Sequence, residues 1–346
     1  MKAALLKAPG HLVVTEVPDP ECPVKGLLVK VEACSICTTD VKMFMHGQRD
    51  LVCPRILGHE MAGVVVETRA DNASFKRGDR VQIAPGLSCG KCPACQQGVT
   101  NQCEVVGIFG FTHHGGFAQY LAVPPESVAS GGVNLIPGGL TFEEATFAEP
   151  LACCLNGQER VHLSSKDAVL ILGAGPIGCL HTLLARAKGA RQILLAEKCP
   201  ERLMIATTAR PGRLINTSKE NLERVVKEET EGRGVDVVML ACPESALEYS
   251  VLKLLAPRGR VCFFSGLPLE KGQVHFDANL LHYREIALTG AYGCTADQNR
   301  MALELMASGQ VNVNWLITKR ISLEEIHTGI DYAARHCGMK VVITEF

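Results

Sequence analysis

An apolar stretch that runs into a glycine-rich turn constrains the fold of this chain more than any other feature. Residues 169–172 are all apolar, and they lead directly into the turn Gly173-Ala174-Gly175-Pro176-Ile177-Gly178, after which a helix-like run begins. Glycines at these spacings permit a tight turn, close approach of the backbone to a pyrophosphate, and close packing of the helix on the strand. The stretch therefore predicts a strand, turn and helix that bind a dinucleotide, with the turn residues in contact with the cofactor.

The residues after the next apolar run indicate which dinucleotide is bound. That run ends at Glu197, about twenty residues beyond the turn, where an acid that binds the ribose 2′-hydroxyl belongs. A carboxylate at this point repels a 2′-phosphate, so the sequence predicts NAD in preference to NADP. Lys198 and Arg202 lie close by and weaken this preference, because basic residues there favour NADP. Gly266, after a later strand-like stretch, completes the candidate cofactor contacts.

Strand and helix signals alternate from about residue 166 to residue 283. This order predicts an α/β domain with a parallel, doubly wound sheet. The strand-like stretches are 168–172, 193–197, 235–241 and 260–265.

The remainder of the chain has a different pattern. Residues 1–150 contain short, alternating apolar stretches separated by glycine and proline, which predicts a β-rich, barrel-like domain. The last residues, 340–346, read as a final strand that returns to this first domain. A chain of 346 residues divides into about two domains. We therefore expect a β-rich domain made of residues 1–150 and 285–346, with a cofactor domain of residues 151–284 inserted in it.

The β-rich part contains a candidate metal site. Cys37 offers a thiolate, and His59 and Glu60 offer an imidazole and a carboxylate side by side. This mixture suits zinc, and three protein ligands leave a fourth position for water or substrate, as in catalytic sites. Asp40 is placed to orient the ligands from outside the coordination sphere. The simpler alternative makes Cys37 a small buried hydrophobe and His59 a core histidine.

A second set of cysteines predicts a different kind of zinc site. Short Cys-x-x-Cys steps bring sulfurs around one ion, and four thiolates close a tetrahedron that has no room for substrate. Disulfides are the alternative, but no secretion signal is visible to favour them. Cys34 and Cys37 also form a redox-type Cys-x-x-Cys, although the strand and helix that such a motif needs are not evident. The four residues of the structural site are Cys89, Cys92, Cys95 and Cys103.

Charge and hydropathy exclude two classes of partner. The formal net charge is −1, with acids and bases interspersed, so there is no basic stripe for nucleic acid. No apolar run reaches the ~18 residues that span a bilayer, and the N-terminal apolar segment is too short for a signal peptide. We therefore expect a cytoplasmic protein with a small-molecule substrate and no nucleic-acid or membrane partner.

Taken together, the two cysteine sets, Gly58-His59-Glu60 and the dinucleotide motif resemble the zinc-dependent medium-chain dehydrogenase/reductase family over the whole chain. The resemblance implies a GroES-like β-rich catalytic domain, a Rossmann cofactor domain and two zinc ions per chain, one catalytic and one structural. Phe147-Ala148-Glu149-Pro150-Leu151 is similar to the polyol branch, which includes sorbitol and sugar-alcohol-phosphate dehydrogenases. That branch implies catalytic zinc ligands among Cys37, His59, Glu60 and Glu149.

The resemblance also implies the reaction. A zinc-bound secondary alcohol of a polyol or sugar alcohol, phosphorylated or not, passes hydride to NAD and becomes a ketose. Thr39 matches the hydroxyl that starts the proton relay, whereas Lys42 stands where many relatives have a histidine. The alternatives are an L-threonine or simple alcohol dehydrogenase and, outside enzymes, a catalytically silent relative that senses redox through zinc and thiols. Relatives suggest a homodimer or homotetramer, and the sequence does not choose the alcohol.

Overall fold

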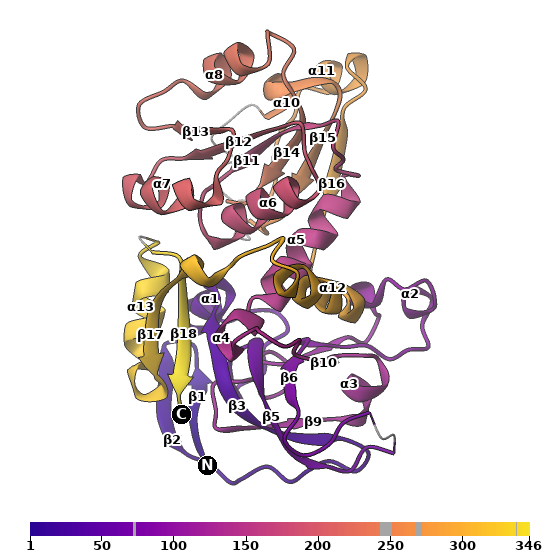
Figure 1. Cartoon of the computed structure of the whole chain (residues 1–346), viewed down its shortest axis with the longest axis vertical. Helices are drawn as coiled ribbons and strands as arrows, with labels where there is room; N and C mark the ends of the chain where they lie inside the picture. The colour runs from indigo at the N-terminus through magenta and orange to yellow at the C-terminus, as the bar shows by residue number, and fades with distance from the viewer. Residues whose placement is uncertain (72–73, 243–250, 268–271, 337) are drawn as a thin grey trace. The chain divides into compact units, whose positions relative to one another are not determined.

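The chain forms two compact units. The computed structural model describes all residues except 72–73, 243–250, 268–271 and 337 (Figure 1). The second unit comprises Cys153–Gly293 and Gln310–Asn312, and the first comprises Met1–Ala152, Cys294–Gly309 and Val313–Phe346. The second unit extends beyond residue 284 because β16 (Ala287–Gly290) pairs in parallel with β15 (Leu255–Phe263) and so belongs to its sheet.

The first unit is rich in short antiparallel strands. Within the described residues its largest sheet has seven strands in the order β10-β6-β5-β3-β18-β17, with β9 also paired to β3. The other two sheets are β2-β1-β4 and β7-β8. The strands are β1 (Lys2–Ala8), β2 (His11–Glu16), β3 (Leu27–Ile36), β4 (Arg55–Ile56), β5 (Glu60–Thr68), β6 (Arg80–Ile83), β7 (Gly86–Leu87), β8 (Gly107–Ile108), β9 (Tyr120–Val123), β10 (Val133–Leu135), β17 (Ile317–Ser322) and β18 (Lys340–Glu345).

Strand β3 is the centre of that sheet. Its residues alternate between buried and partly exposed as far as Glu32, as expected for a strand with one face on a core, and they are all buried from Ala33 to Ile36. There β3 pairs antiparallel with β5 on one side and with β18 on the other. Cys37 and the helix that follows it are therefore attached to a fully buried end of β3.

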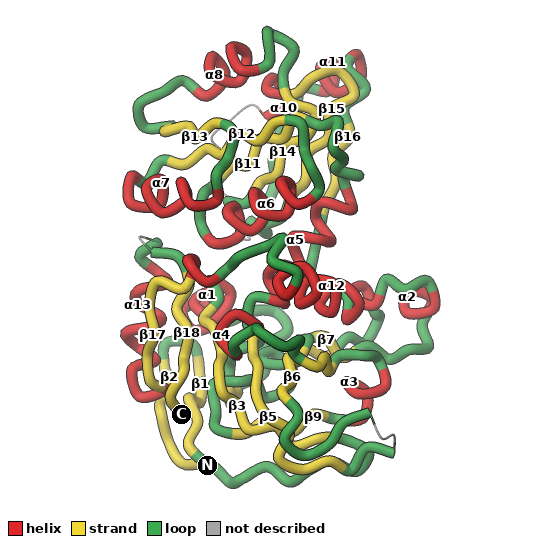
Figure 2. The backbone as a smooth tube through the Cα atoms, in the orientation of Figure 1, coloured by secondary structure: helices red, strands yellow, loops and turns green. Residues whose placement is uncertain are grey.

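Short helices surround these strands (Figure 2). A threonine followed three residues later by a glutamate is the sequence pattern of a capping box, and Thr141 and Glu144 form one. The Thr141 Oγ1 accepts from the Glu144 N–H at 3.1 Å, and the Glu144 carboxylate accepts from the Thr141 N–H at 2.9 Å. The helix that follows is interrupted, so Glu149 lies in a separate helix, α5. The helices are α1 (Thr38–His46), α2 (Pro93–Gln96), α3 (Pro125–Ala129), α4 (Phe142–Ala145), α5 (Ala148–Arg160, which continues into the second unit), α12 (Ala296–Ala307) and α13 (Ile326–Ala334).

The second unit is a parallel sheet with helices between its strands. Its order is β13-β12-β11-β14-β15-β16. The first three strands are therefore added toward one edge and the last three toward the other, and the strand order reverses between β11 and β14. Every residue of β11 is buried, as is usual for a central parallel strand covered on both faces. The remaining elements are β11 (Ala168–Leu172), β12 (Gln192–Glu197), β13 (Arg213–Asn216), β14 (Val235–Leu240), α6 (Pro176–Ala187), α7 (Pro200–Ala206), α8 (Leu222–Glu229), α10 (Val251–Leu254) and α11 (Ala278–Tyr283).

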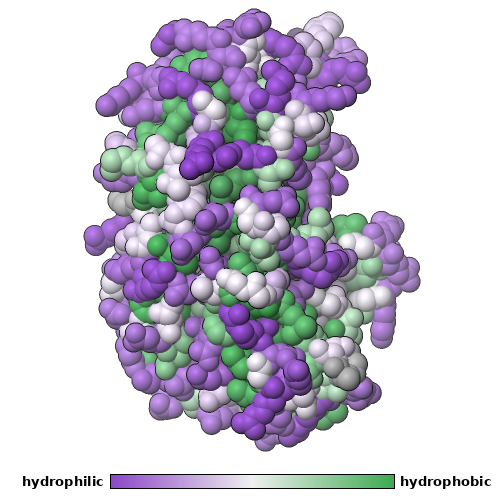
Figure 3. Space-filling view, in the orientation of Figure 1, coloured by the Kyte–Doolittle hydropathy of each residue, from purple (hydrophilic) through white to green (hydrophobic). Residues whose placement is uncertain are grey.

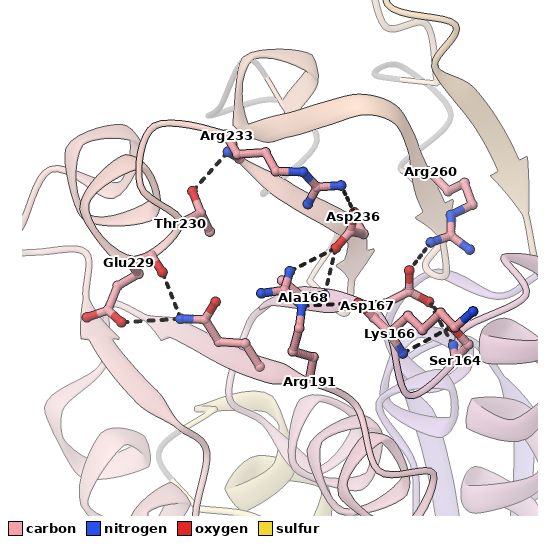
Figure 4. A network of polar contacts seen from close by, with 12 residues as sticks. Ser164, Lys166, Asp167, Ala168, Arg191, Glu229, Thr230, Arg233, Asp236 and Arg260 are labelled. Atoms are coloured by element: carbon pink, nitrogen blue, oxygen red, sulfur yellow. Dashed lines mark hydrogen bonds and ion pairs between the residues drawn. The ribbon is translucent and has the colours of Figure 1, made fainter.

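A polar network closes the amino ends of these strands (Figure 4). The Asp236 carboxylate accepts from the Ala168 N–H at 2.8 Å, from Arg233 at 2.6 Å and from Arg191 at 3.3 Å. Burial opposes ionisation of Asp236, but the hydrogen bonds and charges of these donors outweigh it and lower the pKa of the carboxyl group. Fixed side-chain pairs thus hold the amino end of the sheet, and the glycine-rich turn lies at the opposite, carboxyl end.

Hydrophilic side chains cover much of the face drawn in Figure 3, with hydrophobic ones between them. Within the described residues, no helix combines the length and the apolar composition needed to cross a bilayer.

Candidate metal centres and cofactor site

Cys37, His59 and Glu60 come together in the first unit. Their sulfur, imidazole and carboxylate ligand atoms all lie within 4.8 Å of one another. Cys37 follows β3 directly and is the N-cap of α1, while Glu60 is the first residue of β5 and pairs with Ser35 of β3. The antiparallel pairing of β3 and β5 is therefore what brings the thiol to the histidine and glutamate. This grouping agrees with the predicted zinc ligands.

Asp40 holds the segments that carry these ligands. It is fully buried in the first turn of α1, and its carboxylate accepts from the Cys37 N–H at 2.9 Å and from the Gly58 N–H at 3.2 Å. One of its oxygens is 3.4 Å from the His59 Nδ1, yet that buried nitrogen has no hydrogen-bond partner among the described residues. Metal-bound histidines characteristically present their other ring nitrogen to a carboxylate, and Asp40 has this position.

The electrostatics of His59 suit a cation. Burial of the imidazole opposes protonation, but the negative charges of Asp40 and Cys37 outweigh it and raise the pKa of His59 well above its ordinary value. A bound divalent cation would replace that proton and neutralise the same negative charges. The donor set therefore fits a zinc ion better than an apolar core position.

Glu60 has partners that the sequence did not predict. Its carboxylate is 1% exposed and accepts from the Ser35 hydroxyl and from the Lys340 ammonium, the latter at 2.6 Å. Burial would lower the pKa of Lys340, but the charges of Glu60 and Cys37 raise it. The only sequence signal for Lys340 is a charged residue directly before three apolar ones at the start of a strand, and its partner is 280 positions away.

A glycine is required immediately before His59. Gly58 has φ +91°, and a Cβ there would lie 2.5 Å from the Phe117 ring and 3.0 Å from the Cys34 sulfur. Cys34 itself is fully buried within β3. Burial raises the pKa of the Cys34 thiol well above the ordinary value. A redox-active cysteine needs an accessible thiolate, so the Cys-x-x-Cys redox alternative is not supported.

The other predicted catalytic residues are placed differently. Glu149, in the first turn of α5, lies outside the group formed by Cys37, His59 and Glu60, and its role as a zinc ligand stays a prediction. Its backbone carbonyl accepts from the Cys294 thiol at 3.9 Å. Thr39 and Lys42 both belong to α1, the helix that follows Cys37. Thr39 is half-buried and Lys42 is exposed.

The four remaining predicted ligands also form a group. The sulfurs of Cys89, Cys92, Cys95 and Cys103 lie within 4.8 Å of one another, and the Cys92 and Cys95 sulfurs are 3.5 Å apart. They come from one short segment that contains β7, α2 and β8. The helix α2 begins just after Cys92, with Pro93 at its first position, and places Cys95 on the next turn.

Backbone amides already favour thiolates in this segment, residues 89–103, which we call the cysteine lobe. The N–H groups of Lys91 and Cys92 point at the Cys89 sulfur, each at 3.4 Å, and they lower the pKa of Cys89 to about 6. Burial, together with side-chain hydrogen bonds to Cys92 and Cys103, raises the pKa of Cys95 to about 12. Four sulfurs with this arrangement suit one tetrahedral zinc ion.

The glycine-rich turn of the second unit has the predicted form. Gly173 has φ +101°, and a Cβ on Gly178 would lie 1.7 Å from the Gly173 carbonyl oxygen. Only glycine fits at either position. The turn leads from β11 to the N-terminus of α6, where free N–H groups and the helix dipole favour a phosphate. The chain therefore provides a cradle for a dinucleotide pyrophosphate.

The remaining cofactor candidates lie at the same end of the sheet. Glu197 ends β12 and is 9% exposed, Lys198 is exposed directly after it, and Arg202 is half-buried on α7. Gly266 is exposed beyond the end of β15, where a Cβ would meet no atom of the described residues within 4 Å. Because all four follow carboxyl ends of parallel strands, they have the position expected of dinucleotide contacts, although contact itself stays a prediction.

Known proteins resemble this chain over nearly its full length. D-arabitol-phosphate dehydrogenase of Enterococcus avium is 32% identical over 348 residues, which cover 99% of this chain and 97% of that protein. L-threonine 3-dehydrogenase of Pseudoalteromonas translucida is 29% identical and covers 99% of both chains. The crystal structure of a zinc-binding dehydrogenase from Sinorhizobium meliloti, bound to NADP, is 32% identical, with a TM-score of 0.90 and coverage of 99% of this chain and 98% of that one.

Two domain families match the two parts of the fold. Residues 24–132 match the alcohol dehydrogenase GroES-like domain, and residues 176–308 match the zinc-binding dehydrogenase domain. The predicted combination of a GroES-like β-rich domain and a Rossmann domain is thereby confirmed. These matches, together with polyol dehydrogenases among the relatives, show that the chain is an oxidoreductase and belongs to the zinc-dependent medium-chain dehydrogenase/reductase family.

Proposed function

We propose that the chain oxidises a secondary hydroxyl group of a polyol or sugar alcohol, free or phosphorylated, to a ketone, with NAD as the hydride acceptor. The observation that carries this proposal is the group of Cys37, His59 and Glu60. It has three different donor types, as expected of an open catalytic zinc site, whereas the cysteine lobe has four thiols and is closed. The lobe is proposed as the structural site.

Particular residues have defined parts in this reaction. Cys37 and His59 would hold the catalytic zinc, and Asp40 keeps both in place through the N–H groups of Cys37 and Gly58. When bound, the metal supplies a Lewis acid that makes the substrate hydroxyl more acidic, and the nicotinamide accepts a hydride. Glu60 and Glu149 are the proposed carboxylate ligands. For Glu60, direct ligation requires that its contacts with Ser35 and Lys340 rearrange.

The proton of the substrate needs a path to water. Thr39 is half-buried two residues after Cys37, and its hydroxyl can accept this proton and donate its own in a relay. Lys42 is exposed one turn further along α1, so it has access to solvent. We propose that water completes the relay after Thr39, because a lysine ammonium has no lone pair with which to accept a proton.

The relatives support this substrate class and cofactor type. The most similar relatives include a D-arabitol-phosphate dehydrogenase, which supports a polyol or its phosphate as substrate. A similar solved protein is bound to NADP, which supports a nicotinamide cofactor without deciding between NAD and NADP. The choice of NAD comes from the acid at the end of β12, Glu197.

A substrate panel tests the proposal. Polyols, their phosphates and amino alcohols would be supplied to the purified protein with NAD or NADP, and formation of the reduced cofactor followed by absorbance. We expect turnover with at least one polyol or polyol phosphate that is lost after chelation and restored by zinc. Activity on simple alkanols alone, or activity that survives removal of all zinc, would refute the proposal.

L-threonine oxidation is the second candidate. It has specific support, because an L-threonine 3-dehydrogenase matches 99% of this chain at 29% identity. The same panel decides between the two candidates: a kcat/KM for L-threonine that exceeds every polyol value would establish this one instead.

We also propose that the protein assembles as a homodimer or homotetramer. Within the described part of the chain, strand β16 is an edge of the parallel sheet and its end residues are exposed, so its outer N–H and C=O groups are available to a partner strand. Light scattering on the purified protein measures the assembly directly, and a monomer at micromolar concentration would contradict it.

A further inference from the structure

The carboxylate of Glu197 is bound to backbone N–H groups on two sides. Its Oε2 accepts from the Ala174 N–H at 2.8 Å, and its Oε1 accepts from the Lys198 N–H at 2.8 Å and the Cys199 N–H at 3.0 Å. Ala174 belongs to the glycine-rich turn after β11, whereas Lys198 and Cys199 belong to the turn after β12. The side chain therefore ties the two turns that flank the cofactor cradle to each other.

These bonds restrict what Glu197 does with a ribose. An acid that distinguishes NAD from NADP directs an oxygen at the 2′-hydroxyl and keeps its negative charge exposed to a 2′-phosphate. Here the bonds from described residues engage both lone pairs of Oε1 and one of the two on Oε2. Turning the carboxylate outward would leave backbone N–H groups without partners, which is costly at a site that is 9% exposed.

The same end of the sheet carries two basic side chains. The Arg202 guanidinium lies beside Gly175, the N-cap residue of α6: its Nη1 is 3.2 Å, and its Cζ 3.4 Å, from the position that a Cβ on Gly175 would occupy. Lys198 directly follows Glu197 and is exposed. On the same segment, the Glu201 carboxylate accepts from the Cys199 thiol at 3.0 Å. A guanidinium group next to a helix N-terminus favours a phosphate.

We propose that Glu197 is a positioning residue that holds the glycine-rich turn to the end of β12, and that Lys198 and Arg202 allow the site to accept the 2′-phosphate of NADP as well as the free ribose of NAD. The inference rests on the proposed use of a nicotinamide dinucleotide and refines it. NAD remains the acceptor proposed above and NADP becomes a second one, because the Glu197 charge that would repel a 2′-phosphate is directed at backbone N–H groups.

Direct binding tests this inference without any substrate. Calorimetric titration of the purified chain would compare NAD with NADP, and AMP with adenosine 2′,5′-bisphosphate. We expect the Kd values of NAD and NADP to agree within about tenfold. Arg202→Gln leaves the Glu197 contacts intact and removes a charge, so it should weaken NADP and the bisphosphate by about tenfold more than it weakens NAD and AMP.

Variants of Glu197 distinguish a positioning role from a ribose-reading role. Glu197→Gln replaces one acceptor oxygen with a donor, and Glu197→Asp keeps the charge but is too short to reach both turns. In our proposal each variant weakens NAD and NADP by the same factor and lowers Tm. Glu201→Gln is the matched control on the same segment, and it should leave both Kd values unchanged.

One pattern of results would overturn the inference. If NADP binds the native protein more than about a hundredfold more weakly than NAD, and Glu197→Gln improves NADP while it weakens NAD, then Glu197 reads the ribose directly. That result leaves polyol oxidation with NAD intact. Conversely, equal binding of the two cofactors without turnover of any polyol would refute the proposed substrate and leave this inference standing.

Discussion

The two candidate zinc sites of the first unit differ in how the chain builds them. The cysteine lobe takes all four ligands from residues 89–103, and its donors are four thiols, three of them half-buried and the fourth, that of Cys103, buried. The mixed site takes Cys37 from the start of α1 and His59 and Glu60 from the start of β5, and a buried network with Asp40 and Lys340 surrounds it. The first site depends on local geometry, and the second depends on the correct pairing of distant strands.

The comparison predicts that the lobe needs its metal in order to fold. Cys92→Ala removes one of four thiolates and should abolish zinc binding there, with a fall in Tm of about 10 °C or more, because structural zinc supplies folding free energy directly. Metal analysis and thermal unfolding measure both effects. Cys53→Ala removes a half-buried thiol outside the lobe and is the control. If zinc content and Tm survive Cys92→Ala, the lobe is not a four-cysteine site.

The mixed site should show the opposite pattern. His59→Ala removes a ligand of the catalytic zinc, and we expect kcat/KM to fall by about a thousandfold, or about 4 kcal/mol, while the lobe keeps its zinc. His11→Ala, an exposed histidine on β2, is the control and should retain activity. Metal analysis alongside kinetics separates the two sites. A variant with full activity would show that His59 is a structural histidine.

The buried pair of Glu60 and Lys340 is expected to stabilise the fold around the mixed site. Lys340→Met leaves the Glu60 carboxylate buried without its cation, which should lower the free energy of unfolding by about 3–5 kcal/mol. The double variant Lys340→Met with Glu60→Gln should recover much of this loss. Lys2→Met breaks a solvent-exposed ion pair with Glu324 and should have no measurable effect. Equal unfolding curves for Lys340→Met and Lys2→Met would contradict the assignment.

The smallest expected effect concerns Asp40. Asp40→Asn keeps the size of the side chain but removes its charge and one acceptor, so zinc affinity at the mixed site should fall by about 10- to 100-fold. Competition with a chromophoric chelator measures this affinity. Asp50→Asn, in the loop after α1, is the control and should leave zinc affinity unchanged. An unchanged affinity in Asp40→Asn would mean that the ligands are held without it.

The same contrast explains how much the sequence predicts. The cysteine lobe, the glycine-rich turn and the capping box at Thr141 depend on residues within one short segment, and each has the expected geometry. Local spacing is enough in such cases, because the backbone between the residues fixes their separation. Four of the six strands of the parallel sheet were also predicted closely, since buried parallel strands are continuous apolar runs, whereas the edge strands β13 and β16 were not predicted.

Several contacts between residues distant in sequence were not predicted. Lys340 meets Glu60 only because β18 pairs with β3 next to β5, and no local pattern specifies that neighbour. The orientation of Glu197 likewise depends on the distance between two turns, although its position in sequence was correctly identified as the end of β12. The break between α4 and α5 interrupts a pattern that reads as one helix.

The contact between Lys340 and Glu60 has a consequence for biosynthesis. Both residues belong to the first unit, yet the entire second unit is translated between them. A ribosome that has already released β5 and its metal ligands still holds an incomplete β-rich unit, which lacks the central partner of β3 and the cation that neutralises Glu60. Zinc binding at the mixed site and the onset of activity should therefore come late in synthesis, after the nucleotide-binding unit has emerged.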